Sequence, residues 1–380
     1  MASVFSINSK FNTKSKCYKH LEKVKWNNTP ICPHCDSDRI TKRKTRKFYY
    51  HCNSCNKDFT VLYGTIFEDS KLPLPKWFML VSMMLNARKG ISAKEISRHL
   101  GVTYKTAWYS AMRVRCAMID EAPLLEGIIE VDEVYIGGKP RKRNQPGVTP
   151  DNEANLSNLT NKRGRGTKKV PVVGFVERGG QKRVITEVAG RLTTKSMLSL
   201  LRKYVNEENA IIMSDEARFY NGFDDVVQHL VIKHKERYVD GIIHTNTIEG
   251  YWSIIKNGIR GEYHVLSRKY LPFYLAEFAY KYNRRFKQDE AFSETIENAV
   301  TDESEFVNYK PKESVEKIES GKEERKIAPT KAAHILTQKM IDKKRKKTTQ
   351  RKKIKKFEAN LKEAKKILAD IKKRKIKRAA

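Results

Sequence analysis

The chain has 380 residues, enough for two or three domains, and 39% of them are hydrophobic, enough for buried cores. It contains no apolar run of membrane-spanning length and no N-terminal signal peptide, so we expect a soluble protein that is not exported and has no membrane partner. The formal net charge of +33 predicts a polyanionic partner, most simply nucleic acid. Much of this charge is local, because residues 321–380 hold 24 Lys and Arg against 6 Asp and Glu.

Residues 1–27 predict one short helix, and residues 30–62 predict a compact metal-binding module. Four of the six cysteines form two C-x-x-C pairs, with 16 residues between the pairs: Cys32, Cys35, Cys52 and Cys55. In an unexported protein such pairs indicate a metal site rather than disulfides. Four thiolates in a tetrahedron fit structural Zn²⁺, so the spacing predicts a zinc ribbon. His34 and His51 are interpreted as exposed polar neighbours of the ligands.

A basic hairpin separates the two cysteine pairs. Residues 39–51 carry six Lys and Arg together with three aromatic residues, which suits a surface that contacts DNA. A solvated basic hairpin explains the same composition, and both readings stay open.

Residues 72–90 predict a mostly apolar helix, and residues 91–118 predict a helix-turn-helix with its turn at Gly101. Ile96 and Leu100 of its first helix are expected to pack against Ala107 and Met112 of the second. Four residues would then face outward at the start of a recognition helix and reach DNA: Thr103, Tyr104, Lys105 and Thr106. The alternative is a helical hairpin that only connects two domains.

From residue 128 the pattern changes to that of an α/β domain. Strands are predicted at 128–136, 170–176 and 183–188, then a helix at 194–205 and a fourth strand that ends at Asp215. Residues 139–169 are polar and basic and predict a flexible loop. Residues 246–287 are predicted to be helical, and residues 357–371 form a short amphipathic helical pattern in the basic tail.

Carboxylates occur where the predicted strands and the following helix would bring them together. Asp132 lies in an apolar strand, Asp215 at the end of another, and Glu249 on a helix with an apolar face. Clustered carboxylates are costly unless a cation joins them, so the pattern predicts a Mg²⁺ site, and two such ions can promote phosphodiester chemistry. Alternation places Glu130 on the face of Asp132 and Glu133 on the other, and both are interpreted as salt-bridge or strand-end acids.

Lys256 follows Glu249 by two helical turns, so both side chains project from one face of the helix. An ammonium group there suits a lysine that contacts DNA, and an ordinary surface lysine is the alternative. His244 and Asn246 precede Glu249 and have a spacing that permits a role in the site.

Four segments in chain order resemble one group of DDE transposases, the bacterial and archaeal insertion-sequence enzymes with an N-terminal zinc ribbon, which are related to the eukaryotic Merlin elements. These segments are the cysteine pairs with residues 59–78 (FTVLYGTIFEDSKLPLPKWF), residues 91–108 (ISAKEISRHLGVTYKTAW), residues 130–139 (EVDEVYIGGK) and residues 244–286, which begin HTNTIEGYWSIIK. The resemblance covers about residues 25–290 and does not extend to the tail.

The resemblance implies a ribonuclease H-like catalytic domain, a mixed sheet flanked by helices, that cuts and joins element ends with Mg²⁺ or Mn²⁺. Asp132 and Asp215 match the first and second acids. The third position is Asn or Glu in this group; both Asn246 and Glu249 are present, and Glu249-x6-Lys256 has the spacing common in such transposases. From the sequence pattern and the resemblance together we expect a helix and zinc ribbon (1–65), a helix-turn-helix region (66–122) and the catalytic domain (123–300). The basic tail (301–380), to which the resemblance does not extend, is expected to be partly disordered or helical from its composition.

A transposase of this kind would bind the terminal inverted repeats and the target as double-stranded DNA, and would act as a homo-oligomer because two ends are joined. It would work at the nucleoid of a prokaryotic cytoplasm or in a eukaryotic nucleus. The alternatives are a zinc-ribbon and helix-turn-helix DNA-binding protein without enzymatic activity, and a nuclease of the same fold such as a resolvase.

Overall fold

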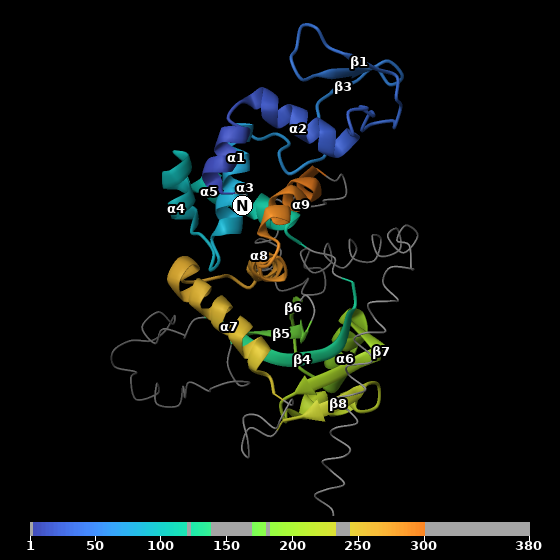
Figure 1. The fold of residues 1–380 in the computed structure, drawn as a ribbon, viewed down its shortest axis with the longest axis vertical. Coiled ribbons are helices and arrows are strands. Elements are labelled where there is room, and N and C mark those ends of the chain that lie inside the picture. Colours follow the sequence, from blue (N-terminus) through green and yellow to red (C-terminus); the bar gives the residue numbers. More distant parts are fainter. Residues whose placement is uncertain (1–2, 120–122, 138–168, 180–182, 233–243, 301–380) are drawn as a thin grey trace, which may run out of the picture. The chain divides into compact units, whose positions relative to one another are not determined.

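The computed structural model describes residues 3–119, 123–137, 169–179, 183–232 and 244–300. The predicted loop, apart from Lys169, and the predicted helix at 357–371 lie outside these residues. The described chain forms two compact units: a helical unit, made chiefly of residues 3–119 and 252–300, and a sheet unit, made of residues 123–136, 169–179, 183–232 and 244–251 (Figure 1). Within the described ranges no helix is both long and apolar enough to cross a membrane.

The helical unit contains a small antiparallel sheet and most of the helices. In chain order its elements are α1 (Val4–Lys10), α2 (Lys14–Trp26), β1 (Ile40–Lys42), β2 (Tyr50–Cys52), β3 (Asp58–Phe59), α3 (Leu74–Asn86), α4 (Ala93–Leu100), α5 (Tyr104–Ala117), the π-helical turn η5 (Ile259–Tyr263), α8 (Leu271–Asn283) and α9 (Gln288–Val300). Helix α7 (Asn246–Gly258) begins in the sheet unit and ends in the helical unit.

The N-terminal prediction of one helix is wrong, because residues 3–26 form two. The Ser3 side chain accepts a hydrogen bond from the Ser6 N–H, and that of Thr13 accepts one from the Lys16 N–H. Each hydroxyl therefore caps the start of a helix, which divides the segment. Phe11 lies between the helices and packs on Phe78 of α3, with ring centroids 4.7 Å apart.

Helices α4 and α5 are separated by three residues. Gly101 ends α4 with a left-handed φ of 59°, and the Thr103 side chain caps α5 by accepting from the Thr106 N–H at 3.2 Å. Ile96 and Leu100 share one buried cluster with Ala107, as expected. Met112 does not belong to that cluster; its sulfur accepts instead from the Arg115 guanidinium at 3.5 Å.

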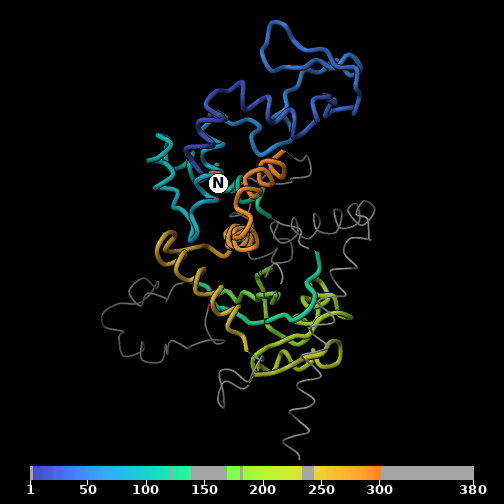
Figure 2. Tube along the Cα trace, in the orientation of Figure 1, coloured from blue at the N-terminus to red at the C-terminus, as the bar shows by residue number. Residues whose placement is uncertain are grey.

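Elements far apart in the sequence share the core of the helical unit. Helix α9 contributes Phe292 and Ile296 to the cluster formed by α1–α5, and the Ile66 N–H donates to the Ala299 carbonyl at 3.1 Å. Figure 2 shows α9, in orange, beside the blue N-terminal helices. The predicted domain boundaries follow sequence order and stay predictions, whereas the contacts group residues 252–300 with the N-terminal helices.

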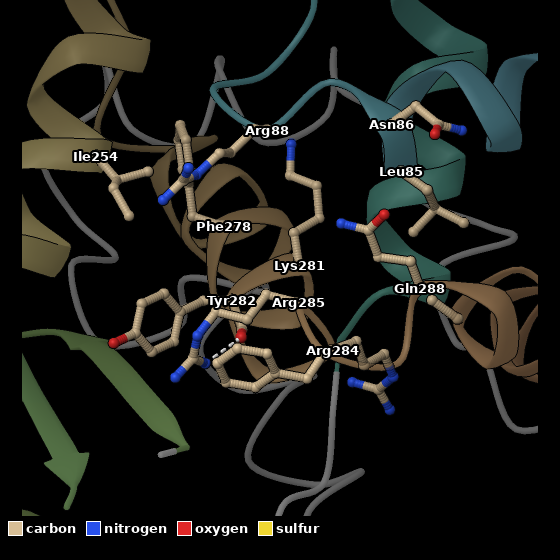
Figure 3. Close-up of a pocket in the computed structure, with 12 residues that line it drawn as sticks. Leu85, Asn86, Arg88, Ile254, Phe278, Lys281, Tyr282, Arg284, Arg285 and Gln288 are labelled. Carbon is tan, nitrogen blue, oxygen red and sulfur yellow. Dashed lines mark hydrogen bonds between the residues drawn. The ribbon is translucent and has the colours of Figure 1, made fainter. Parts of the chain in front are cut away.

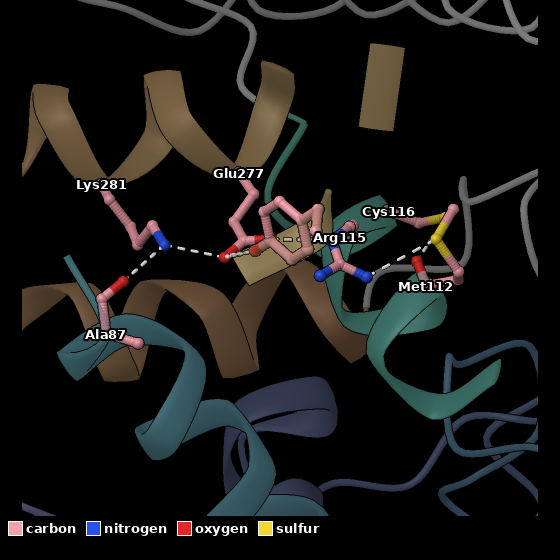
Figure 4. Close-up of polar contacts among 7 residues, drawn as sticks. Ala87, Met112, Arg115, Cys116, Glu277 and Lys281 are labelled. Atoms are coloured by element: carbon pink, nitrogen blue, oxygen red, sulfur yellow. Dashed lines mark hydrogen bonds and ion pairs between the residues drawn. The ribbon is translucent and has the colours of Figure 1, made fainter. Parts of the chain in front are cut away.

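A buried charged cluster joins α5 to α8 (Figure 4). The Glu277 carboxylate is fully buried and accepts from Arg115 Nε and Lys281 Nζ, each at 2.7 Å. Lys281 also donates to the Ala87 carbonyl at the end of α3. Burial alone raises the pKa of Glu277, but the charges of Lys281 and Arg115 outweigh it and hold the pKa below its ordinary value.

The sheet unit has one mixed sheet with strand order β6-β5-β4-β7-β8. Strand β4 lies at its centre, antiparallel to β5 and parallel to β7. The elements are β4 (Leu125–Ile136), β5 (Val170–Glu177), β6 (Val184–Val188), α6 (Thr194–Tyr204), β7 (Val205–Ser214), the 3-10 helix η4 (Arg218–Phe223) and β8 (Gln228–Val231). The predicted α/β class with a mixed sheet and flanking helices is confirmed.

One face of this sheet packs under α6 and η4. Ile129 and Val131 of β4 and Phe175 of β5 share a buried cluster with residues of these elements, among them Met197, Leu201, Tyr220 and Phe223. The residues of β4 that point the other way include Glu130 and Asp132, so alternation separates an apolar face from one with carboxylates.

Two predicted elements differ from the structure. Strand β7 begins earlier than the predicted fourth strand and ends at Ser214, and the short strand β8 was not predicted. Residues 246–287 are helical, as predicted, except at 264–270 and 284–287: α7 ends at Gly258, η5 continues to Tyr263, and α8 starts at Leu271 with Pro272 in its first turn. A proline there lacks the N–H that a continuous helix requires, so it favours a new helix start.

Candidate functional site

The parallel pairing of β4 and β7 brings Asp132 and Asp215 to the same edge of the sheet. The register pairs Glu130 with Met213, so Asp132 and Asp215 each lie two residues further along. Asp215 is the first residue past the end of β7, and a carboxylate oxygen of each aspartate lies within 4.8 Å of the other. Asp215 is held in a turn, because its Oδ1 accepts from the Ala217 N–H at 3.0 Å.

Glu133 joins these two acids. One carboxylate oxygen from each of Asp132, Glu133 and Asp215 lies within 4.8 Å of the others. Glu133 contacts Tyr220, which belongs to the cluster of Ile129 and Val131, so Glu133 lies on the face of β4 that alternation predicts for it. Neither periodicity nor spacing in the sequence signals that its carboxylate lies near those of Asp132 and Asp215.

The buried side chain of Tyr220 contacts the acidic group of Asp132, Glu133 and Asp215. Tyr220 of η4 is 1% exposed and donates its hydroxyl to Glu133 Oε2 at 3.0 Å. Burial, followed by the negative charges of Glu133, Asp132 and Asp215, raises the Tyr220 pKa well above its ordinary value. Three carboxylates this close repel one another, and a bound divalent cation removes that cost.

Glu130 anchors the first turn of α7 to the sheet. Its fully buried carboxylate accepts from the Ile248 N–H at 2.9 Å and from the Arg178 guanidinium. Arg178 also contacts His244, whose Nδ1 lies 3.5 Å from Glu130. The interpretation of Glu130 as an ion-paired acid agrees with these contacts, and its role is to fix the beginning of the helix that carries Glu249.

The remaining predicted residues lie on α7. Asn246 is its first residue, exposed, and Glu249 is exposed in its first turn, where the Thr245 hydroxyl donates to it at 3.2 Å. Lys256 is exposed in the last turn. Among the described residues, the close acidic group contains Asp132 and Asp215 but not Glu249. The assignment of Glu249, Asn246 and Lys256 to the site stays a prediction.

The donor set of the acidic group fits a hard divalent cation. Carboxylate oxygens are the ligands that Mg²⁺ and Mn²⁺ prefer, and all three side chains are half-buried, which leaves them open to a ligand from solvent.

The four predicted zinc ligands converge. Cys32 Sγ lies 3.6 Å from Cys55 Sγ, and Cys35 Sγ lies 3.6 Å from Cys52 Sγ. The two turns repeat the same backbone bonds, from the Asp36 N–H to the Cys32 carbonyl and from the Asn56 N–H to the Cys52 carbonyl, each 2.9 Å long. This arrangement of four sulfur atoms fits tetrahedral Zn²⁺.

Neither nearby histidine belongs to the cysteine group. His51 Nδ1 lies 2.7 Å from the Asp58 carboxylate, which also pairs with Arg43, and the His34 ring packs on Tyr63.

The predicted DNA-contacting residues lie at the start of α5. Thr103, Tyr104 and Lys105 are exposed, and Tyr104 is 56% exposed although it is aromatic. This exposure satisfies one requirement of a recognition helix. That α4 and α5 bind DNA as a helix-turn-helix stays a prediction.

Comparisons with known proteins match the two segments that hold the acidic group and the cysteine cluster. The model of the ISXO2-like transposase domain matches residues 124–283, and that of the transposase zinc-ribbon domain matches residues 12–58. A protein of the transposable element ISH50 of Halobacterium salinarum is 28% identical, over 69% of this chain and 89% of its own length. The cysteine cluster and the acidic group thus each lie within a matched transposase domain, and the chain carries the zinc-ribbon and ISXO2-like domains of insertion-sequence transposases.

Proposed function

We propose that this protein is a DDE-type DNA transposase that binds the terminal inverted repeats of its element and catalyses metal-dependent cleavage and strand transfer. The observation that carries the proposal is the proximity of two aspartates inside the matched transposase domain: carboxylate oxygens of Asp132, within β4, and of Asp215, just past the end of β7, lie within 4.8 Å of each other. The strand order, with β4 central, antiparallel to β5 and parallel to β7, supports assignment of the sheet unit to the ribonuclease H-like fold.

Asp132 and Asp215 would hold the catalytic Mg²⁺ or Mn²⁺ ions. When bound, such ions activate the attacking oxygen and stabilise the leaving 3′-oxygen of a phosphodiester. The protein's own contribution is to fix the two carboxylates, through the β4–β7 register and the Asp215 turn. Tyr220 holds Glu133 beside them by its hydrogen bond.

Two glutamates compete for the third carboxylate position. Glu249 has the sequence spacing to Lys256 and lies in the helical turn that Glu130 fixes to the sheet. Glu133 lies with the two aspartates. We assign the third ligand to Glu249 and a supporting role to Glu133, so Glu249→Gln is expected to abolish cleavage and Glu133→Gln only to slow it. If Glu133→Gln abolishes cleavage and Glu249→Gln only slows it, Glu133 is the third ligand and Glu249 has the supporting role.

DNA recognition would fall to the zinc ribbon and to the start of α5, including Lys105. Lys256 would contact DNA near the reacting phosphate, and residues 139–169 and the tail would add backbone contacts. Because transposition joins two ends, the active form would be a homo-oligomer on DNA.

The decisive experiment measures cleavage and binding separately, with a labelled inverted-repeat end. Asp132→Asn keeps the size of the side chain but removes its charge, so cleavage is expected to vanish while end binding is retained. Cleavage that persists in this variant would refute the site.

The chief rival is a DNA-binding protein without enzymatic activity. A wild-type protein that binds the end but shows no divalent-dependent strand transfer would support the rival. Activity on branched DNA without preference for the inverted repeat would indicate a resolvase-like nuclease.

A further inference from the structure

A basic pocket of about 300 Å³ lies within the helical unit, where α8 ends (Figure 3). Its walls come from the end of α3 and the residues after it, from α7, from the second half of α8, from the turn that follows α8, and from the start of α9. Its described lining contains no Asp or Glu. Four basic side chains line it: Arg88, Lys281, Arg284 and Arg285.

Two of these cations form ion pairs with glutamates that are not part of the pocket lining. Lys281 pairs with Glu277, and Arg284 pairs with Glu294 while its guanidinium lies 3.7 Å from the centre of the Tyr280 ring. These contacts fix the wall of the pocket, so that it is formed before any ligand binds.

Arg285 and Arg88 are the other two basic residues of the lining. The guanidinium of Arg285 lies 3.9 Å from the centre of the Tyr282 ring and 4.5 Å from that of Phe286. Burial, and then the positive charge of Arg88, lower the pKa of Arg285. A pocket lined by four basic side chains, with no Asp or Glu in its described lining, favours a bound anion.

Phe286 adds an exposed aromatic surface beside these cations. Its side chain lies in the turn after α8 and is 76% exposed, although a phenylalanine is normally buried. The Arg285 guanidinium lies against this ring, and the two flat groups together form a surface on which a base can stack. Aromatic platforms beside cations bind unpaired nucleotides, whose base stacks while the phosphate pairs.

We propose that this pocket holds one unpaired nucleotide of a DNA strand, with its phosphate at Arg88 and Arg285 and its base stacked on Phe286. A paired base is buried in its own duplex and cannot enter, so the ligand is a nucleotide outside the double helix. An acidic peptide would use the charges but not the exposed ring. The choice of DNA rests on the proposed function.

The test compares binding of the full-length protein to a short duplex and to the same duplex with one unpaired thymidine, by fluorescence anisotropy without divalent ions. The wild type is expected to prefer the unpaired site about tenfold, the scale of one base stacked on an aromatic ring. Phe286→Ala should abolish this preference, and Phe5→Ala, at another exposed ring, should retain it.

A second pair of variants tests the charge. Arg285→Gln should remove the preference and flatten the dependence of log K on log salt by about 0.7, the value for one phosphate of an unpaired strand. Lys287→Gln removes the same charge two residues further on, outside the pocket, and should retain the preference. Zinc content and the thermal unfolding midpoint should remain those of the wild type in all four variants.

Three results would overturn the pocket: equal wild-type binding to both duplexes, a preference that survives Phe286→Ala, or competition by polyglutamate as strong as that by the unpaired duplex. Equally strong competition by thymidine 5′-monophosphate would assign the pocket to a free nucleotide and overturn its place on a strand. A protein that binds neither duplex contradicts the proposed function, whereas one that binds both equally contradicts this inference alone.

Discussion

The charged cluster around Glu277 gives the sharpest prediction about stability. Glu277→Gln keeps the shape of the side chain but removes its charge, which leaves Arg115 and Lys281, 2% and 7% exposed, without their shared carboxylate. Lys281 can lose its proton, whereas an arginine remains charged in a protein. Removing one partner of a buried ion pair costs about 3–5 kcal/mol.

For a unit of this size, that cost corresponds to a fall of roughly 6–20 °C in the thermal unfolding midpoint, at about 2–4 °C per kcal/mol. The assay is thermal unfolding followed by circular dichroism at neutral pH. The matched control is Glu290→Gln on α9, an exposed glutamate 3.4 Å from Lys287, which should shift the midpoint by less than about 2 °C.

The pH dependence provides a second readout of the same cluster. Because the pKa of Glu277 is lowered in the folded protein, its ionisation stabilises the fold above the unfolded pKa, and this contribution is lost as the pH falls through the folded pKa. Glu277→Gln should therefore lose most stability at neutral pH and differ least from the wild type in acid. A midpoint within about 2 °C of the wild type at neutral pH would refute the reasoning.

Three further predictions concern the zinc site, the anchor of α7 and one close helix approach. Cys52→Ser or a zinc chelator should unfold the ribbon but not α3–α5, because the separate ribbon core consists of four buried residues, two of them ligands; circular dichroism and zinc content measure this. Glu130→Gln weakens the contact to Arg178 and should reduce cleavage of the labelled end while end binding is retained. Gly258→Ala places a methyl group 2.4 Å from the Lys89 carbonyl oxygen and 2.6 Å from the Phe278 ring, and should destabilise the helical unit by about 1–3 kcal/mol in denaturant unfolding.

Local patterns in the sequence were sufficient for several features. The two C-x-x-C pairs predict a cysteine cluster because each pair closes its own tight turn, and the structure brings all four sulfur atoms together. Asp132 is predicted as a metal ligand because its carboxylate occurs within an apolar strand, and that strand, β4, is central in the sheet. These features depend on short-range spacing, which is visible in a single sequence.

The tertiary structure decided what depends on distant partners. Glu133 lies with Asp132 and Asp215 near the end of β7, and the register of β4 with β7 joins segments more than 80 residues apart. The ion pair of Arg115 with Glu277 joins residues 162 positions apart, and residues of α9 share one buried cluster with Ile7 of α1. Periodicity shows which face of an element is apolar, but the packing of the whole chain decides which element covers that face.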